Sequence, residues 1–335
     1  MDPLFRLKLD YITRIPMLTV EEFHTLSTTE LEARPAALAI PVFGPQREIT
    51  MCQGVRAFPD SSLIVQQFSP VEGDVVHKIW TNQQGEVKEL PLLPFALSDP
   101  HSTSLQYRTL LTESWTEWAR AGLEQYRLMA ELYQSETGKK LLENFGPFAL
   151  AYTLKMGSAW ISSVDTLGMD PVMEEGYPLY GKVALPSIVK AQFDAMSSLV
   201  MTALQRGMEE NLDVLEGISD WQVFFVAVAV MGHIVSQMRA DRARHARQRG
   251  IEAMFTEPDS VEMTEKGMTE ILRRFHRFQE SFDVARLLES SHPGVGKLYV
   301  AVQEMDDAEE FSTGWWLRQA TETDWQPRPT YQATL

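Results

Sequence analysis

The longest apolar stretch of the sequence runs from Trp221 to Val235, and only Gln222 and His233 interrupt it with polar side chains. Asp220 stands directly before it and can cap a helix. A helix that is apolar on all sides is buried in a protein core or spans a membrane. The stretch is shorter than the ~20 residues that a membrane span needs, so we expect a central core helix and no membrane partner.

Helical patterns are found on both sides of this stretch. From about Leu105, apolar and aromatic residues recur at spacings of three and four and so share one stripe of a helix; they are Leu111, Trp115, Trp118, Gly122, Tyr126, Met129 and Tyr133. We expect this helix to stop at Gly138. Further helices are expected over 187–215, 268–287 and 298–320, and a Gly- and Pro-rich irregular connection over 165–186. Residues 106–335 are therefore predicted to form an α-helical body.

Residues 1–105 have short β-type runs punctuated by Pro and Gly. Val75–Trp80, a turn that ends at Gly85, and Glu86–Leu90 predict a hairpin. Ile49–Met51 and Leu63–Val65 predict two more short strands. The expected fold class is mainly α: a helical bundle-like body over 106–335, with a small N-terminal hairpin and irregular region over 1–105 packed on it.

The charge balance and the cysteine count exclude several classes of protein. The chain carries 30 Lys+Arg against 46 Asp+Glu, which gives a formal net charge of −16. A protein that coats nucleic acid or an anionic membrane needs basic residues for phosphate contacts, so these functions are disfavoured. Cys52 is the only cysteine, which excludes an intrachain disulfide and a zinc–thiolate cluster and favours a reducing compartment.

The sequence carries no strong catalytic motif. No two histidines have the i, i+4 spacing of a metal site, and no glycine-rich phosphate loop is present. We therefore expect no catalytic residue, no metal ligand and no cofactor. Asp306-Asp307, followed by Glu310, resembles a magnesium–diphosphate motif. It lies near the C-terminus with no later helix to supply further ligands, so a solvated acidic face is the simpler interpretation.

Two groups of residues are candidates for binding a partner. A basic run follows the apolar stretch and could contact phosphate, direct nuclear import or simply stabilise the end of a helix; it includes Arg242, Arg244, Arg247 and Arg249. An acidic and aromatic segment contains Phe311, Trp315 and Trp316. Such a segment binds partner grooves when exposed, but paired tryptophans are more often buried in a core.

A family pattern lies in the segment 170–194. Pro178-Leu179-Tyr180-Gly181 is followed by an apolar run into Pro186 and by a helix start with Gln192-Phe193-Asp194. The apolar stretch after Trp221, Ile271-Leu272 with Phe275-His276, and Asp324-Trp325-Gln326-Pro327 continue the pattern. Together they resemble the regulatory, C-terminal body of fungal binuclear zinc-cluster transcription factors over nearly the whole chain.

The resemblance implies a non-enzymatic transcriptional regulator, nuclear or both nuclear and cytoplasmic. It would act through a protein partner, a transcription factor or co-regulator, on a fungal metabolic or secondary-metabolite gene set, with a small-molecule effector possible. The family's zinc cluster needs six cysteines, so sequence-specific DNA binding through that module is excluded, and the chain is either a stand-alone regulatory body or part of a longer one. Gly181, Pro186, Gln192 and Asp194 match the pattern and are interpreted as structural. The alternative is a helical enzyme or a small-molecule-binding protein of a metabolic pathway.

Overall fold

The computed structural model describes residues 25–82, 84–174, 176–177, 179–214, 221–249, 272–273, 276, 293–304 and 312–322. The chain divides into two compact units. The first comprises Met1–Trp118 and Leu150–Gly207, and the second comprises Ala119–Ala149 and Met208–Leu335. Each unit therefore combines segments that lie far apart in the sequence.

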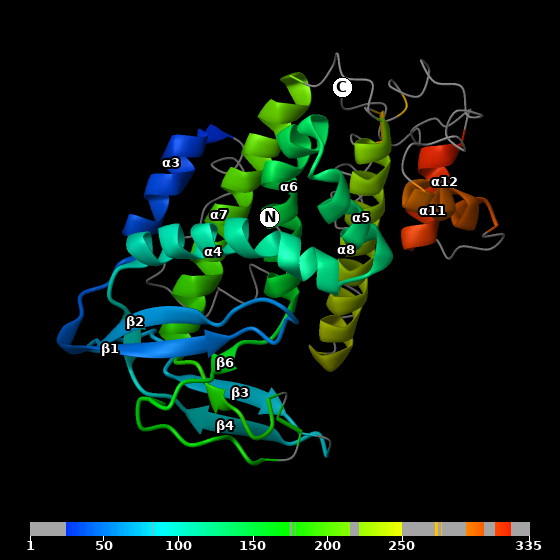
Figure 1. Ribbon diagram of the computed structural model, residues 1–335. Coiled ribbons are helices and arrows are strands. Elements are labelled where there is room, and N and C mark those ends of the chain that lie inside the picture. Colours follow the sequence, from blue (N-terminus) through cyan, green and yellow to red (C-terminus); the bar gives the residue numbers. More distant parts are fainter. Residues whose placement is uncertain are drawn as a thin grey trace. The chain divides into compact units, whose positions relative to one another are not determined.

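A five-stranded antiparallel sheet organises the first unit (Figure 1). Its strand order is β5-β2-β1-β6-β7. The bounds are β1 (Phe43–Cys52), β2 (Ser61–Gln67), β5 (Phe95–Leu97), β6 (Trp160–Ile161) and β7 (Val183–Ala184). Ile49 pairs with Leu63 and Val65 pairs with Leu97, and all four side chains are buried. Alternate residues of β1 and β2 thus point into one core, as period-2 patterning requires.

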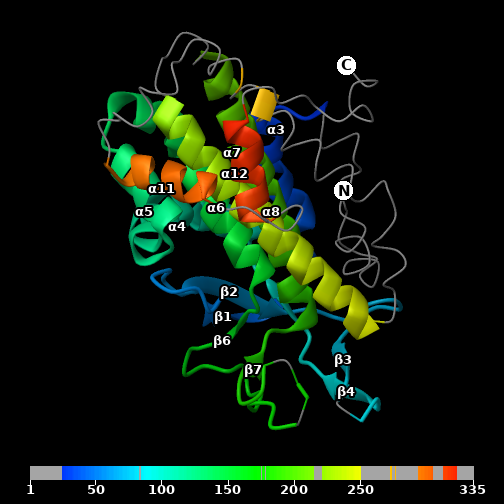
Figure 2. The same ribbon diagram turned by 90° about the vertical axis from the view of Figure 1, so that its right-hand side faces the viewer.

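Helices cover one face of this sheet. Those with residues in the first unit are α3 (Thr28–Ala33), the 3₁₀ helix η1 (Arg34–Leu38), α4 (Pro100–Ala121), α6 (Glu136–Met156) and α7 (Ser187–Val214). Figures 1 and 2 place α4 and α7 on one side of β1 and β2. The short helix α3 begins at a capping box, in which Ser27 and Glu30 satisfy each other's backbone N–H groups.

The predicted hairpin is present in the first unit as β3 (His77–Thr81) and β4 (Val87–Pro91). Asn82 shapes its turn, because its Oδ1 accepts hydrogen bonds from the backbone N–H groups of Gln84 and Glu86. Gly85 has a φ of 80°, which a glycine adopts without strain. In both views the hairpin lies on the side of the five-stranded sheet opposite α4 and α7 (Figures 1 and 2).

The second unit is built around α8 (Trp221–Arg249). Its other described helices are α5 (Glu124–Leu132), α11 (Pro293–Gln303) and α12 (Thr313–Thr321). Val223 to Val230 of α8 are all buried, so the predicted core helix is present. The side chain of Trp316 on α12 lies against Gly232 of α8, where a Cβ would approach the Trp316 Cβ to 2.9 Å.

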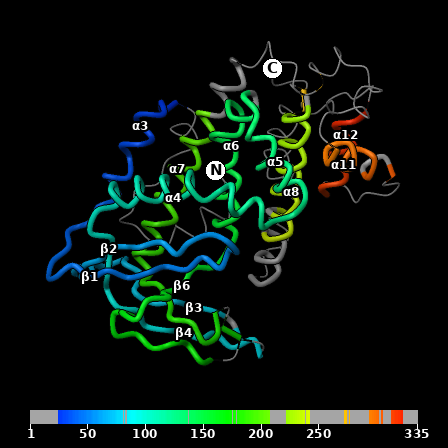
Figure 3. The backbone as a smooth tube through the Cα atoms, viewed as in Figure 1, coloured from blue at the N-terminus to red at the C-terminus, as the bar shows by residue number. Residues whose placement is uncertain are grey.

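The expectation of a mainly α fold is wrong, because the first unit contains a five-stranded sheet and a separate hairpin. The strands at Ile49–Met51 and Leu63–Val65 were predicted, but β1 begins six residues earlier, at Phe43. β6 and β7 have two residues each, which is too short to show alternation. Figure 3 shows β6 beside β1, from which more than a hundred residues of sequence separate it.

Three predicted helix boundaries are also wrong. The expected helix through Gly138 breaks after Ala121, because Leu123 adopts an extended conformation before α5. Gly138 lies inside α6, and its N–H donates a 2.9 Å hydrogen bond to the Ser135 hydroxyl near the start of that helix. The last expected helix, 298–320, is two helices, α11 and α12. Most of the helix expected over 268–287 lies outside the described residues.

Candidate protein-docking surface

Gln192, one of the family-pattern residues, forms hydrogen bonds with two segments that lie far from it in the sequence. It lies on the second turn of α7 and its side chain is completely buried. The Gln192 Oε1 accepts a 2.8 Å hydrogen bond from the Leu97 N–H of β5. Its Nε2 donates a 2.9 Å bond to the Leu38 carbonyl at the end of η1. One carboxamide thus connects α7 with a strand and with the segment that precedes β1.

The other family-pattern residues lie at the entry to α7 and in the loop before it. Gly181 has a φ of 72°, and its N–H donates a 2.7 Å bond to the Val172 carbonyl. The Pro186 carbonyl accepts from the Lys190 N–H on the first turn of α7. The Asp194 carboxylate pairs with Lys190 one turn away. The four residues therefore shape the loop and the helix start and do not converge on one point.

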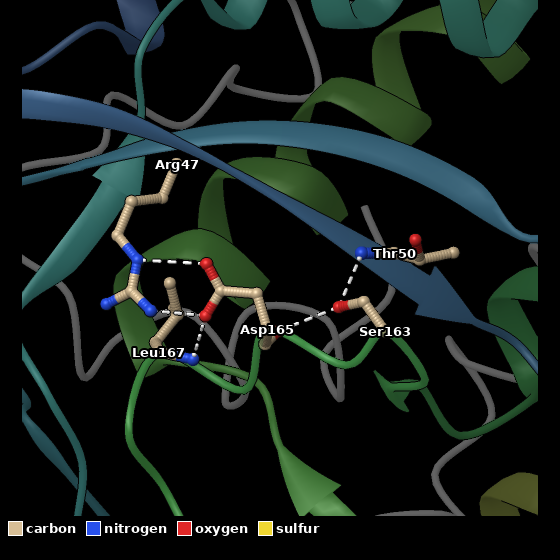
Figure 4. Close-up of polar contacts among 5 residues, drawn as sticks. All are labelled: Arg47, Thr50, Ser163, Asp165 and Leu167. Atoms are coloured by element: carbon tan, nitrogen blue, oxygen red, sulfur yellow. Dashed lines mark hydrogen bonds and ion pairs between the residues drawn. The ribbon is translucent and has the colours of Figure 1, made fainter.

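A paired arginine and aspartate fix this loop to the sheet (Figure 4). Both guanidinium nitrogens Nε and Nη2 of Arg47 on β1 donate to the carboxylate of Asp165. The Arg47 contact, with the Leu167 N–H that also donates to this carboxylate, lowers the pKa of Asp165 below its usual value. The Ser163 hydroxyl accepts a 3.0 Å bond from the Thr50 N–H of β1. These contacts hold the chain immediately after β6.

The β3–β4 hairpin and the segment 171–182 pack together and form what we call the hairpin lobe, residues 75–92 and 171–182. Trp80, Val172 and Tyr177 form its small core, with Leu90 and Leu179 packed around them. The rings of Trp80 and Tyr177 meet edge to face at 4.9 Å between centroids. Burial raises the pKa of Tyr177 to about 12, so its hydroxyl stays protonated at neutral pH. Trp80 and Leu90 therefore use one face of the hairpin for packing.

The opposite face of the hairpin is exposed and carries two large apolar side chains among polar ones. Ile79 on β3 is 56% exposed and Val87 on β4 is 71% exposed. Both belong to the face that carries His77 and Glu89, because residues opposite each other in an antiparallel ladder share a face. Met173 and Tyr180 of the same lobe are exposed at 63% and 55%. Met173 and Tyr180 belong to the segment 171–182, which packs on the other face of the hairpin, so Ile79 and Val87 alone are assigned to the outer face. Exposed apolar side chains that lie close together are typical of protein-interaction surfaces.

Charges around the hairpin lobe are predominantly acidic. Its three lysines are engaged within the chain: Lys78 and Lys182 lie over the rings of Tyr177 and Trp160, and Lys88 pairs with Glu86. Among the described residues, no ion pair is formed by the exposed carboxylates of the lobe or of the chain next to it; these are Glu72, Asp170 and Glu174. The lysines keep their charge, but residues 72–92 and 170–182 carry seven carboxylates against three lysines, so the lobe and the chain next to it have a net negative charge.

The predicted partner-binding residues lie elsewhere. The backbone of α8 includes Arg242, Arg244, Arg247 and Arg249, but their side chains lie outside the described residues, as do Phe311 and the Asp306–Glu310 motif. Trp315 and Trp316 lie on α12, with ring centroids 4.5 Å apart. Trp316 is 2% exposed and packs on α8, so within the chain it is a core residue. Trp315 is half-buried beside it.

Helix α8 has the length and apolar composition of a membrane span over Gln222–Asp241. Within that window, 65% of the residues are buried inside the protein. His233 on this helix contacts Thr313 of α12 and the ring of Tyr126 on α5. Packing inside the second unit therefore accounts for the apolar character of α8, as it does for the core helix of a globular protein.

The described part of the chain was compared with two requirements of site chemistry, a set of metal ligands and an activated thiol. No group of three or more His, Cys, Asp or Glu side chains is placed there to hold a metal ion. Cys52 is half-buried at the end of β1, and burial raises the pKa of its thiol, against a smaller lowering from the Gly54 backbone. A thiol held protonated is a weak nucleophile.

A protein-family model described as KpeA transcription factor matches residues 19–283, which is more than half of the chain. The chain belongs to the KpeA transcription factor family. No curated protein and no solved structure matches it. Membership in the KpeA transcription factor family bears out the expected role in transcription, and the narrower likeness to a fungal zinc-cluster regulatory body stays a prediction.

The KpeA family match contains the whole hairpin lobe and ends before α12. Sequence reasoning found the hairpin but missed its exposed face. The alternation of Lys78, Ile79 and Trp80 shows that β3 has two faces, each with a large apolar side chain. Nothing in a single sequence tells which of the two faces is covered by other parts of the chain.

Proposed function

We propose that this member of the KpeA transcription factor family regulates transcription through protein contacts made by the hairpin lobe, without catalysis of its own. The carrying observation is the exposed apolar face of the hairpin, with Ile79 and Val87 at its centre, inside the span of the family match. The fold supports this role because the inner face of the same hairpin is anchored by Trp80 and Tyr177, which makes the outer face a rigid platform.

The proposed mechanism is recruitment or masking of another factor that reads DNA. The acidic charge and the single cysteine support this, because contact with DNA through a zinc cluster would need basic residues and six cysteines. We further propose that the protein acts in the nucleus, or in the nucleus and cytoplasm, on a fungal metabolic or secondary-metabolite gene set, with or without a small-molecule effector. The resemblance of 170–194 to fungal regulatory bodies supports that part of the proposal.

A tethered reporter assay tests the proposal. Residues 1–335 are fused to an unrelated DNA-binding domain, and reporter output is compared with that of the domain alone. We expect output to change at least about twofold in either direction. In the Ile79→Ser/Val87→Ser double variant the outer face of the hairpin becomes polar and the change should shrink.

Leu105→Ser is the matched control, since Leu105 is 47% exposed on α4 of the same unit but outside the lobe. It should behave as the unaltered fusion. An unchanged reporter, with the fusion shown to be folded and nuclear, would contradict the proposed mode of action. An equal loss of the reporter change in the control and in the double variant would show that the hairpin lobe does not make the proposed contacts.

A further inference from the structure

The outer edge of β4 carries unpaired backbone groups. In the hairpin ladder the Leu92 N–H donates to the Val76 carbonyl and the Asn82 N–H donates to the Glu86 carbonyl. These contacts make 76/92 and 82/86 hydrogen-bonded pairs of the ladder. Hydrogen-bonded and non-hydrogen-bonded pairs alternate along an antiparallel ladder, so the hydrogen-bonded pairs between those two are Lys78 with Leu90 and Trp80 with Lys88. The N–H and C=O groups of Val87 and Glu89 then point away from β3, and no backbone hydrogen bond to them is present among the described residues.

The outer edge of β3, unlike that of β4, has a hydrogen-bond partner within the described part of the chain. The His77 carbonyl on that edge accepts a 3.2 Å hydrogen bond from the Ser187 hydroxyl at the start of α7. Figures 1 and 2 both place β3 between β4 and the five-stranded sheet. β4 is therefore the open edge of the hairpin. An open strand edge pairs readily with another extended chain, and this is one established mode of peptide recognition.

We propose that the β4 edge binds an extended, basic segment of a partner protein by strand addition. This inference rests on the proposed function and names the edge and the chemistry of the partner. The added strand would pair with the outward groups of Val87 and Glu89. Its side chains on the outer face would lie beside Val87, which favours an apolar residue, and beside Glu89, which favours Lys or Arg.

Charge complementarity selects a basic partner over an acidic one. Glu89 is 62% exposed in its side chain, and its nearest cation is the His77 ring at 3.7 Å, which is charged only when protonated. Lys78 and Lys182 keep their charge over the neutral rings, but residues 72–92 and 170–182 carry seven carboxylates against three lysines, on a chain with a formal net charge of −16. Like charges across an interface are repelled and opposite charges steer association.

The test uses the full chain and two fluorescein-labelled probe peptides. One is Val-Thr-Lys-Thr-Val-Thr-Lys, in which Val and Lys alternate along one face of the strand, and the other has Glu in place of each Lys. We expect fluorescence polarisation to show at least about tenfold tighter binding of the basic peptide at low salt, with the difference shrinking as salt rises. Equal affinities for the two peptides would overturn the charge complementarity on which the proposal depends.

Glu89→Pro and Glu89→Gln separate backbone pairing from charge. Both remove the carboxylate, but only Glu89→Pro removes the outward N–H. Proline is tolerated at edge positions whose N–H faces solvent, and Pro91 already occupies the equivalent register of β4. We expect Glu89→Pro to bind the basic peptide at least about fivefold more weakly than Glu89→Gln. Equal binding by the two folded variants would overturn strand addition.

A second measurement leaves the protein unchanged. The basic peptide is N-methylated at alternate residues, in the two possible registers, and each version is bound to the unaltered chain. Strand addition predicts that one register binds nearly as well as the parent peptide and the other loses at least about tenfold. Equal effects in both registers would overturn it. If the peptides do not bind but the tethered fusion still changes reporter output, the proposed function stands and only the strand-addition inference fails.

Discussion

At the scale of single residues, the buried carboxamide of Gln192 has the clearest role. Its two hydrogen bonds satisfy one N–H and one C=O of backbone that would otherwise be buried without partners. A buried polar group without a partner costs ~1–3 kcal/mol. The helix start that brings Gln192 there was predicted from the sequence, because Ser187 follows Pro186 directly. Its two partners, Leu97 and Leu38, were beyond prediction, since they lie about 95 and 154 residues away.

Gln192→Leu should lower the free energy of unfolding by about 2–5 kcal/mol, because it leaves both backbone groups of Leu97 and Leu38 unpaired in the core. Urea unfolding followed by circular dichroism measures this. Gln67→Leu, at an exposed position of β2, is the control and should change stability by less than about 0.5 kcal/mol. A Gln192→Leu protein as stable as the control would show that the bridge is dispensable.

His233 makes stability depend on pH. Burial lowers the pKa of its imidazole below the ordinary value of 6.5. Between that folded-state pKa and 6.5 the unfolded chain binds a proton that the folded chain does not, so stability falls as pH falls through this window and is fully retained above it. His233→Gln removes the titration and keeps a polar partner for Thr313. The difference in unfolding free energy between the two proteins should therefore change in favour of the variant from pH 7 to pH 5, and a constant difference would contradict this account.

At the scale of elements, structure that is set by neighbouring residues could be predicted from the sequence, and pairing between distant segments could not. The hairpin was predicted because both strands and the Asn82–Gly85 turn lie within about fifteen residues of sequence. β6 and β7 were missed because their strand character comes only from pairing with β1 and with each other. The break between α4 and α5 was missed for a related reason, since the apolar stripe continues across Gly122 without a change of period.

The contact between α8 and α12 depends on a glycine. Gly232→Ala would place a Cβ 2.9 Å from the Trp316 Cβ, so one of the two helices must shift. We expect it to destabilise the chain by about 1–3 kcal/mol in thermal or urea unfolding. Gly296→Ala in α11 is the matched control, because apart from its chain neighbours and the backbone of its own helix, no described atom lies within 4 Å of its added Cβ. It should stabilise the chain by about 0.5–1 kcal/mol, as alanine does in a helix interior, and equal signs for the two variants would refute the packing argument.

At the scale of the whole molecule, charge governs what the chain can bind. With a formal net charge of −16, the purified protein should show no salt-dependent binding to a random DNA duplex at concentrations up to about 10 μM, because non-specific binding depends on basic contacts to phosphate. Fluorescence anisotropy in 50–200 mM salt measures this. Submicromolar binding that weakens steeply with salt would instead assign the arginine run of α8 to phosphate contact.

The predicted division of the chain into 1–105 and 106–335 stays a prediction.

The order of the strands also has a consequence in time. β1 acquires β2 as a neighbour after a short loop, but its other neighbour, β6, follows 161 − 51 = 110 residues after the paired Met51. A ribosome adds ~5–20 residues per second, so during synthesis one side of β1 waits several seconds or more for its partner. During that interval the unpaired edge of β1 is exposed, and it could pair with a strand of another nascent chain.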